Sequence, residues 1–120
     1  FALLFTMLVA TGCAKQSENN NIHLATGGTG GTYFAYGNAL KDVAKQDSNI
    51  DMSIQMSAGS AANIRLIENN IVDMAIVQND TLTDAFGGKG EFEGNPIKKT
   101  KAVAGLYTEN YQIVVNNKFG

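Results

Sequence analysis

Three short apolar segments, separated by longer stretches of helical pattern, constrain the fold of this chain more than any other feature. Ile22–Thr26 has the length and apolar character of a strand, and residues 49–56 place Ile or Met at every second position. Such a period of two is typical of a strand with one buried face. Val72–Val77 is a third segment of the same kind. The sequence therefore predicts three strands that do not follow one another directly.

The stretches between these strands carry the signals of helices. One helix is expected from Thr32 to about Gln46 and a second from Ser60 to about Asn69, with Thr32 and Ser60 as capping residues. A short helix is expected at about Asp80–Phe86, where two glycines follow it. Strands that alternate with helices pair in parallel. The predicted fold class is therefore α/β with a parallel sheet.

Two further strands are expected near the end of the sequence. Ala102–Tyr107 and Tyr111–Asn116 each read as a strand. Residues 87–101, which precede them, have no clear period and read as a loop.

Three loops that follow the first three strands share a composition suited to ligand binding. They are Gly27–Tyr33, Ser57–Asn63 and Gln78–Asp80, all rich in Gly, Ser, Thr, Asn or Gln. In an open parallel sheet, ligands bind beyond the carboxyl ends of the strands, where these loops should meet. Free N–H groups at helix starts attract negative charge, and the side chains of Thr29, Thr32, Ser57 and Ser60 add hydroxyls. The alternative is that these loops are ordinary turns and helix caps.

Several classes of function find no support in the sequence. The glycine loop lacks the last glycine of a dinucleotide site, where Tyr33 stands, and no Gly-Lys-Ser/Thr follows it. No nucleophile–base pair is recognisable, and Glu91 and Glu93 lie in a loop with lysines, as a solvated charged loop would. His23 is the one histidine, so a metal site is not expected. Nine Lys/Arg against eleven Asp/Glu leave no basic face for nucleic acid.

The first residues have the order of an export signal. Residues 1–12 are an apolar run followed by small residues, and Cys13 and a polar tract come next. We expect 1–12 to be a signal peptide truncated at its start, Cys13 to be lipidated, and 13–21 to be a polar tether. Ala10 departs from the usual leucine of a lipobox, so a free thiol in a tail is the alternative. A core helix is less suitable for 1–10, because Thr6 is its one polar residue.

Four blocks of sequence in order resemble one known family. They read LATGGTGGTYFAYGNAL, SAGSAANIRLIENN, DMAIVQND and AVAGLYTENYQIVV, and they extend over about Ile22 to Val115. Together they are similar to the TAXI family of TRAP-transporter solute receptors.

The resemblance implies a two-lobed periplasmic-binding-protein-like fold of type II, without a cofactor. Residues 22–110 would form the first lobe, and 111–120 a strand that crosses into a second lobe. It also implies an extracytoplasmic, lipid-anchored receptor that delivers a small carboxylate or amino acid to TRAP membrane subunits; the alternative is a surface lipoprotein without a transporter. The ligand-facing residues carried over are Thr29, Gly30, Gly31, Thr32, Tyr33, Ser57, Gly59, Ser60, Gln78, Asn79, Asp80 and, at the hinge, Tyr107.

The loops also predict how charge is shared in such a site. A ligand carboxylate is expected at Gly30–Thr32, where glycines allow close approach to a helix start. Asp80 would repel a simple anion and is expected to face an amine or hydroxyl of the ligand. The alternative is that Asp80 only caps the short helix that follows it.

Overall fold

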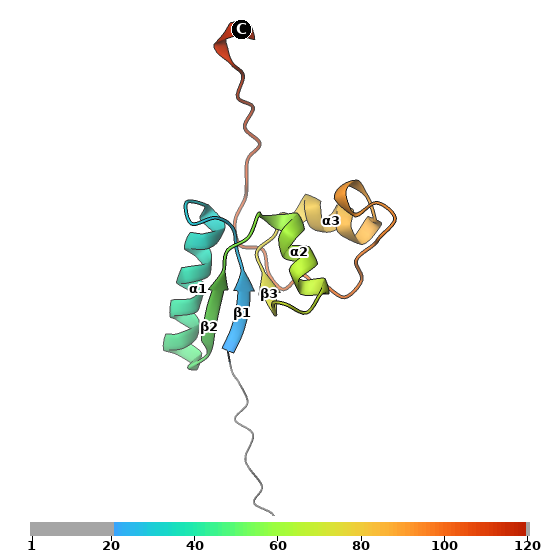
Figure 1. Cartoon of the computed structure of the whole chain (residues 1–120). Coiled ribbons are helices and arrows are strands. Elements are labelled where there is room, and N and C mark those ends of the chain that lie inside the picture. Colours follow the sequence, from blue (N-terminus) through green and yellow to red (C-terminus); the bar gives the residue numbers. More distant parts are fainter. Residues whose placement is uncertain (1–20, 120) are drawn as a thin grey trace, which may run out of the picture.

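A parallel three-stranded sheet forms the centre of the molecule in the computed structural model, which describes residues 21–119 (Figure 1). Its strands are β1 (Asn21–Ala25), β2 (Asp51–Gln55) and β3 (Met74–Ala75), in the order β2-β1-β3. β1 pairs with β2 along its whole length, whereas β3 pairs only with Leu24 and Ala25. The predicted α/β class and parallel sheet are confirmed, although β3 is shorter than its apolar segment.

Three α-helices alternate with the strands as predicted. They are α1 (Thr32–Ser48), α2 (Ser60–Glu68) and α3 (Asn79–Gly87), and the short 3₁₀ helices η1 (Gly90–Phe92) and η2 (Asn117–Phe119) follow. α1 ends at Asn49 and α3 ends at Gly88, both with a left-handed backbone conformation. Glycine adopts this conformation without steric cost, which explains why Gly88 stops α3.

Two apolar clusters hold these elements together. In the first, Leu24, Met52 and Ile76 of the strand region pack with Leu40 and Ala44 of α1. The second joins α2, α3 and η1 through buried residues, namely Ile64, Leu82, Ala85 and Phe92. Figure 1 shows the consequence, with α1 along one side of the molecule and α2 and α3 together on the other. The carboxyl ends of the strands therefore lie between the starts of α1 and α2.

The prediction of two strands at Ala102–Tyr107 and Tyr111–Asn116 is wrong. Residues 101–116 form no helix or strand, and Val103 and Ile113 are 84% and 91% exposed. A strand requires a neighbouring backbone for its ladder of hydrogen bonds, and no strand of the described sheet runs beside either segment. Figure 1 shows the last part of this segment leading away from the sheet.

The predictions for the signal peptide 1–12, the lipidated Cys13 and most of the tether 13–21 lie outside the described residues. Asn21, the last tether residue, is already the first residue of β1. Among residues 21–119, no helix combines the length and the apolar character needed to cross a bilayer.

Candidate functional site

A recess of about 480 Å³ lies at the carboxyl ends of the strands. All three loops that follow the strands contribute to it, together with two acidic residues from farther along the chain. Its lining consists of Gly27, Gly31, Thr32, Tyr33, Ala58, Gly59, Ser60, Ala61, Gln78, Thr81, Glu91 and Glu109. Ligand pockets of small molecules span about 300–1,000 Å³, so the recess has room for a molecule of amino-acid size.

The starts of α1 and α2 both open on this recess. Gly31 and Gly59 are the N-cap residues, and neither helix has a side-chain capping hydrogen bond. Thr32 and Ser60 do not cap, contrary to prediction, because each is already the first helical residue and lies one position too late. First-turn N–H groups without a side-chain partner remain available, and the helix dipole places partial positive charge there. Both helix starts can therefore receive an anionic group.

Ser60 connects the three loops around the recess. Its hydroxyl accepts a hydrogen bond from the backbone N–H of Gln78 at 2.9 Å and lies 3.4 Å from the Tyr33 hydroxyl. Ser60 is only 9% exposed, so this connection is largely shielded from water. Burial raises the pKa of Tyr33; the bond with Ser60 opposes this, and the charges of Glu109 and Asp80 raise it further. Tyr33 therefore remains a neutral phenol that can donate a hydrogen bond.

Ser57 and Asn63 shape the loops without lining the recess. The Ser57 hydroxyl donates to the carbonyl of Thr26 at 2.9 Å and accepts the N–H of Gly59 at 3.0 Å. The fully buried Asn63 amide donates to the carbonyls of Thr26 and Ile76, at 2.6 and 2.7 Å. These bonds fix the positions of the first two loops relative to the end of β3. Ser57 thus positions the site instead of facing a ligand from the recess.

The predicted residues divide between the recess and its surroundings. The structure brings Gly31, Thr32, Tyr33, Gly59, Ser60 and Gln78 to the recess. Thr29 and Gly30 lie on the exposed turn before α1 and do not line it. A larger cavity of about 1,380 Å³ adjoins the recess, between β3, α3 and the C-terminal segment, residues 101–119. It is lined by the remaining predicted residues Asn79, Asp80 and Tyr107.

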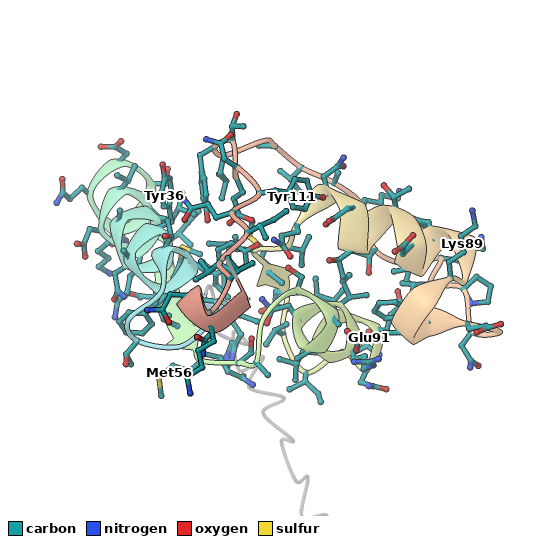
Figure 2. All side chains as sticks on the ribbon, turned by 90° about the horizontal axis from the view of Figure 1, so that it is seen from above. Tyr36, Met56, Lys89, Glu91 and Tyr111 are labelled. Atoms are coloured by element: carbon teal, nitrogen blue, oxygen red, sulfur yellow. The ribbon has the colours of Figure 1, made fainter. Side chains whose placement is uncertain are left out.

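Asp80 is engaged by protein groups in this structure. One carboxylate oxygen accepts the N–H of Thr81 at 2.6 Å, and the other accepts the hydroxyl of Tyr111 at 3.1 Å. The bond from the Thr81 backbone, followed by the bond from Tyr111, holds the pKa of Asp80 below its ordinary value. Figure 2 shows Tyr111 beside the start of α3, where Asp80 is located.

Tyr107 anchors the C-terminal segment to α1. Its ring stacks on Tyr36 with a centroid distance of 4.7 Å and an interplanar angle of 25°. Its hydroxyl donates to Glu109 at 2.9 Å. Burial raises the pKa of Tyr107, and the bond to Glu109 adds to this effect.

Sequence reasoning missed the acidic residues of the recess. Glu109 accepts a hydrogen bond from the side-chain amide of Gln78 at 2.9 Å, and Glu91 is paired with Arg65 at 3.3 Å. Figure 2 shows Glu91 beside α2, which carries Arg65. Glu109 lies within the fourth block of the resemblance but was not among the residues carried over from it, and Glu91 was assigned to a solvated charged loop. Among residues 21–119, no group of three His, Cys, Asp or Glu is placed to hold a metal ion.

A comparison with known protein families gives the architecture a context. Residues 24–120 match the model of the NMT1-like family, a periplasmic-binding-protein-like family of extracytoplasmic solute-binding proteins. The match extends over the end of β1, over β2 and β3, the three helices and every residue of the recess. An α/β unit with a polar recess at the carboxyl edge of its parallel sheet agrees with such a binding lobe. The chain belongs to the NMT1-like family of solute-binding proteins.

Proposed function

We propose that this chain is the first ligand-binding lobe of a receptor that captures a small carboxylate, such as glutamate, glutamine or a related acid, without chemical conversion. The observation that carries this proposal is the pair of helix starts, α1 and α2, which open on one recess without side-chain caps. A carboxylate there would take hydrogen bonds from first-turn N–H groups and gain from both dipoles. Membership of a solute-binding family supports the same conclusion.

The test is calorimetric titration of the full-length protein with L-glutamate and L-glutamine, preceded by native mass spectrometry of co-purified small molecules. The first lobe alone should bind weakly or not at all, because one side of the ligand would stay in water. Thr32→Asp is the informative variant, because it places a carboxylate at the exposed first turn of α1, within the recess. We expect it to weaken binding about tenfold or more, whereas folding stability stays equal or rises, since acidic residues favour helix starts.

Gln46→Glu is the matched control for Thr32→Asp. It adds the same charge to the exposed last turn of α1, far along the helix from the recess, and should leave affinity unchanged. If Thr32→Asp binds as tightly as the wild type, the carboxylate does not lie at the start of α1. If the full-length protein binds no small carboxylate at all, the proposed function is rejected.

We further propose that the receptor serves a TRAP-type transporter and closes on its ligand with a second lobe. The resemblance to TAXI receptors, including the block that contains Tyr107, supports both statements. The alternative is a surface lipoprotein that binds amino acids without a transporter. A neighbouring gene for TRAP membrane subunits would favour the receptor, and its absence, together with normal ligand uptake in a deletion strain, would favour the alternative.

The receptor is proposed to be held at the outer face of the cell membrane through Cys13. An apolar run and small residues precede this cysteine, in the order of a lipoprotein signal. Cys13→Ser should move the protein from the membrane fraction to the soluble extracytoplasmic fraction of its host. Lack of labelled fatty acid on wild-type Cys13 would contradict the anchor.

A further inference from the structure

The lining of the recess carries an imbalance of charge. Glu91 and Glu109 contribute carboxylates, and no Lys or Arg among residues 21–119 is part of the lining. A ligand with only negative charge would therefore approach two like charges while it binds at the helix starts. A ligand that also carries a positive group would relieve this repulsion.

The two carboxylates differ in how they are compensated. Glu91 is paired with Arg65, at 3.3 Å. Glu109 accepts hydrogen bonds from neutral groups, the Gln78 amide and the Tyr107 hydroxyl, each at 2.9 Å. Of the ion pairs found within residues 21–119, none includes Glu109. Glu109 is thus the lining carboxylate whose charge has no cationic partner in the described chain.

Both donors hold Glu109 in a defined position. Tyr107 stacks on Tyr36 of α1, and the backbone N–H of Gln78 is bonded to the hydroxyl of Ser60. Each donor occupies one acceptor position on a different carboxylate oxygen. An ionised carboxylate has about four such positions, so each oxygen can accept another hydrogen bond.

We propose that Glu109 recognises an ammonium group of the ligand, so that the receptor selects amino acids over dicarboxylates that lack the amine. This inference rests on the proposed function, because it assigns the ligand carboxylate to the helix starts across the same recess. Glu109, rather than Asp80, has this role. Glu109 lines the recess, whereas Asp80 does not.

The experiment is a calorimetric comparison, on the full-length protein, of L-glutamate with glutarate, which has the same carbon chain and both carboxylates but no amine. The wild type should bind glutamate about tenfold or more tightly than glutarate, the difference expected for one charge-assisted hydrogen bond. Glu109→Gln keeps side-chain atoms of similar shape and should abolish most of this preference. It should weaken glutamate binding about tenfold or more and leave glutarate binding equal or tighter.

Glu93→Gln is the matched control, since it removes the same charge from an exposed residue outside the recess and should leave both affinities unchanged. Thermal unfolding of each variant by circular dichroism separates loss of binding from loss of fold. Equal weakening of both probes by Glu109→Gln, or equal affinity of the wild type for both, would overturn the role of Glu109 while the carboxylate receptor stands. If the wild type binds neither probe, the proposed function and this inference fail together.

Discussion

Asn63 is the residue on which the geometry of the recess depends most directly. Its side-chain amide is fully buried and donates to one carbonyl in each of two loops, Thr26 and Ile76. Within the described part of the chain, the side-chain oxygen of Asn63 has no hydrogen-bond partner. The NH₂ group of an amide has two N–H donors and can bond to two carbonyls at once, whereas an ionised carboxylate can only accept. This difference explains why an Asn, and not an Asp, suits this position.

Replacement of Asn63 should therefore destabilise the fold strongly. Asn63→Ala leaves the Ile76 carbonyl without its side-chain donor and the Thr26 carbonyl with the Ser57 hydroxyl alone. We expect a loss of about 1–3 kcal/mol in the free energy of unfolding. Asn63→Asp should cost more at neutral pH, because it places a carboxylate against the same two carbonyls. Urea unfolding measures both, with Asn110→Ala as control because Asn110 is exposed and lies outside the helices and strands. A loss below about 0.5 kcal/mol for Asn63→Ala would show that these bonds do not support the fold.

The Asp80 carboxylate should report on the C-terminal segment. Its pKa lies below the ordinary value through the Thr81 backbone bond first and the Tyr111 hydroxyl second. A depressed pKa in the folded state means that these contacts stabilise the fold above the unfolded-state pKa, and that this contribution is lost as the pH falls through the folded value. Tyr111→Phe should raise the pKa of Asp80 and still leave it below the ordinary value.

An NMR titration of the Asp80 side-chain carboxyl carbon measures this shift. Tyr107→Phe is the control, because Tyr107 bonds to Glu109 and not to Asp80. An unchanged titration of Asp80 in Tyr111→Phe would mean that the segment does not reach α3 in solution.

At the scale of elements, α1 approaches the sheet closely because of one buried glycine. A Cβ atom at Gly37 would lie 2.5 Å from the Cγ2 atom of Thr26 and 3.6 Å from side-chain atoms of Leu24 and Ile54. Thr26 is fully buried at the end of β1, so it has little freedom to move away. The glycine thus positions α1, and with it the helix start at the recess.

Gly37→Ala tests this contact against helix propensity. In an exposed helix, the change from Gly to Ala stabilises by about 1 kcal/mol. At Gly37 the overlap of the new Cβ atom with Thr26 should outweigh the gain in helix propensity. We expect a net loss of about 1–3 kcal/mol in the free energy of unfolding, as overpacking of a core typically costs. Gly30→Ala is the control, since its Cβ would meet no atom within 4 Å. A stabilised Gly37→Ala variant would show that α1 shifts without cost.

The elements that the sequence predicts correctly are those whose signals are local. The period-two strand 51–55 and the helices that begin at Thr32 and Ser60 follow from apolar spacing and from the loops around them. The C-terminal strands were not predictable in this way, because a strand also requires a partner at its edge. The cap assignments at Thr32 and Ser60 missed by one residue, since a glycine in a suitable conformation can serve as N-cap without any side chain.

At the scale of the whole molecule, the site could be predicted only where topology brings loops together. Parallel strands end at the same edge, so the loops that contain Tyr33, Ser60 and Gln78 were expected to meet, and they do. Glu109 reaches the recess from a segment with no regular structure. Its position depends on the stack of Tyr107 on Tyr36, a contact between distant parts of the chain that no local pattern encodes.

The last prediction concerns the boundary between the packed unit, residues 21–100, and the C-terminal segment, residues 101–119. Glu68 of α2 accepts hydrogen bonds from the backbone of Lys99 and from the backbone and hydroxyl of Thr100, at 3.1–3.2 Å. Beyond Thr100, which is buried, residues 101–116 are mostly exposed. Within residues 21–119, trypsin should therefore cleave first after Lys101 and Lys118, because proteolysis favours exposed backbone without regular structure.

Arg65 provides the internal reference for this digestion. It lies within α2 and is paired with Glu91, so cleavage there should require opening of the packed unit and should follow much later. Glu68→Gln weakens the acceptor for Lys99 and Thr100, and cleavage after Lys99 should then become faster while cleavage after Arg65 stays slow. Mass spectrometry over a time course resolves these products. Cleavage after Arg65 as early as after Lys101 would contradict a packed unit that ends at Thr100, because α2 would then be no better protected than the segment beyond it.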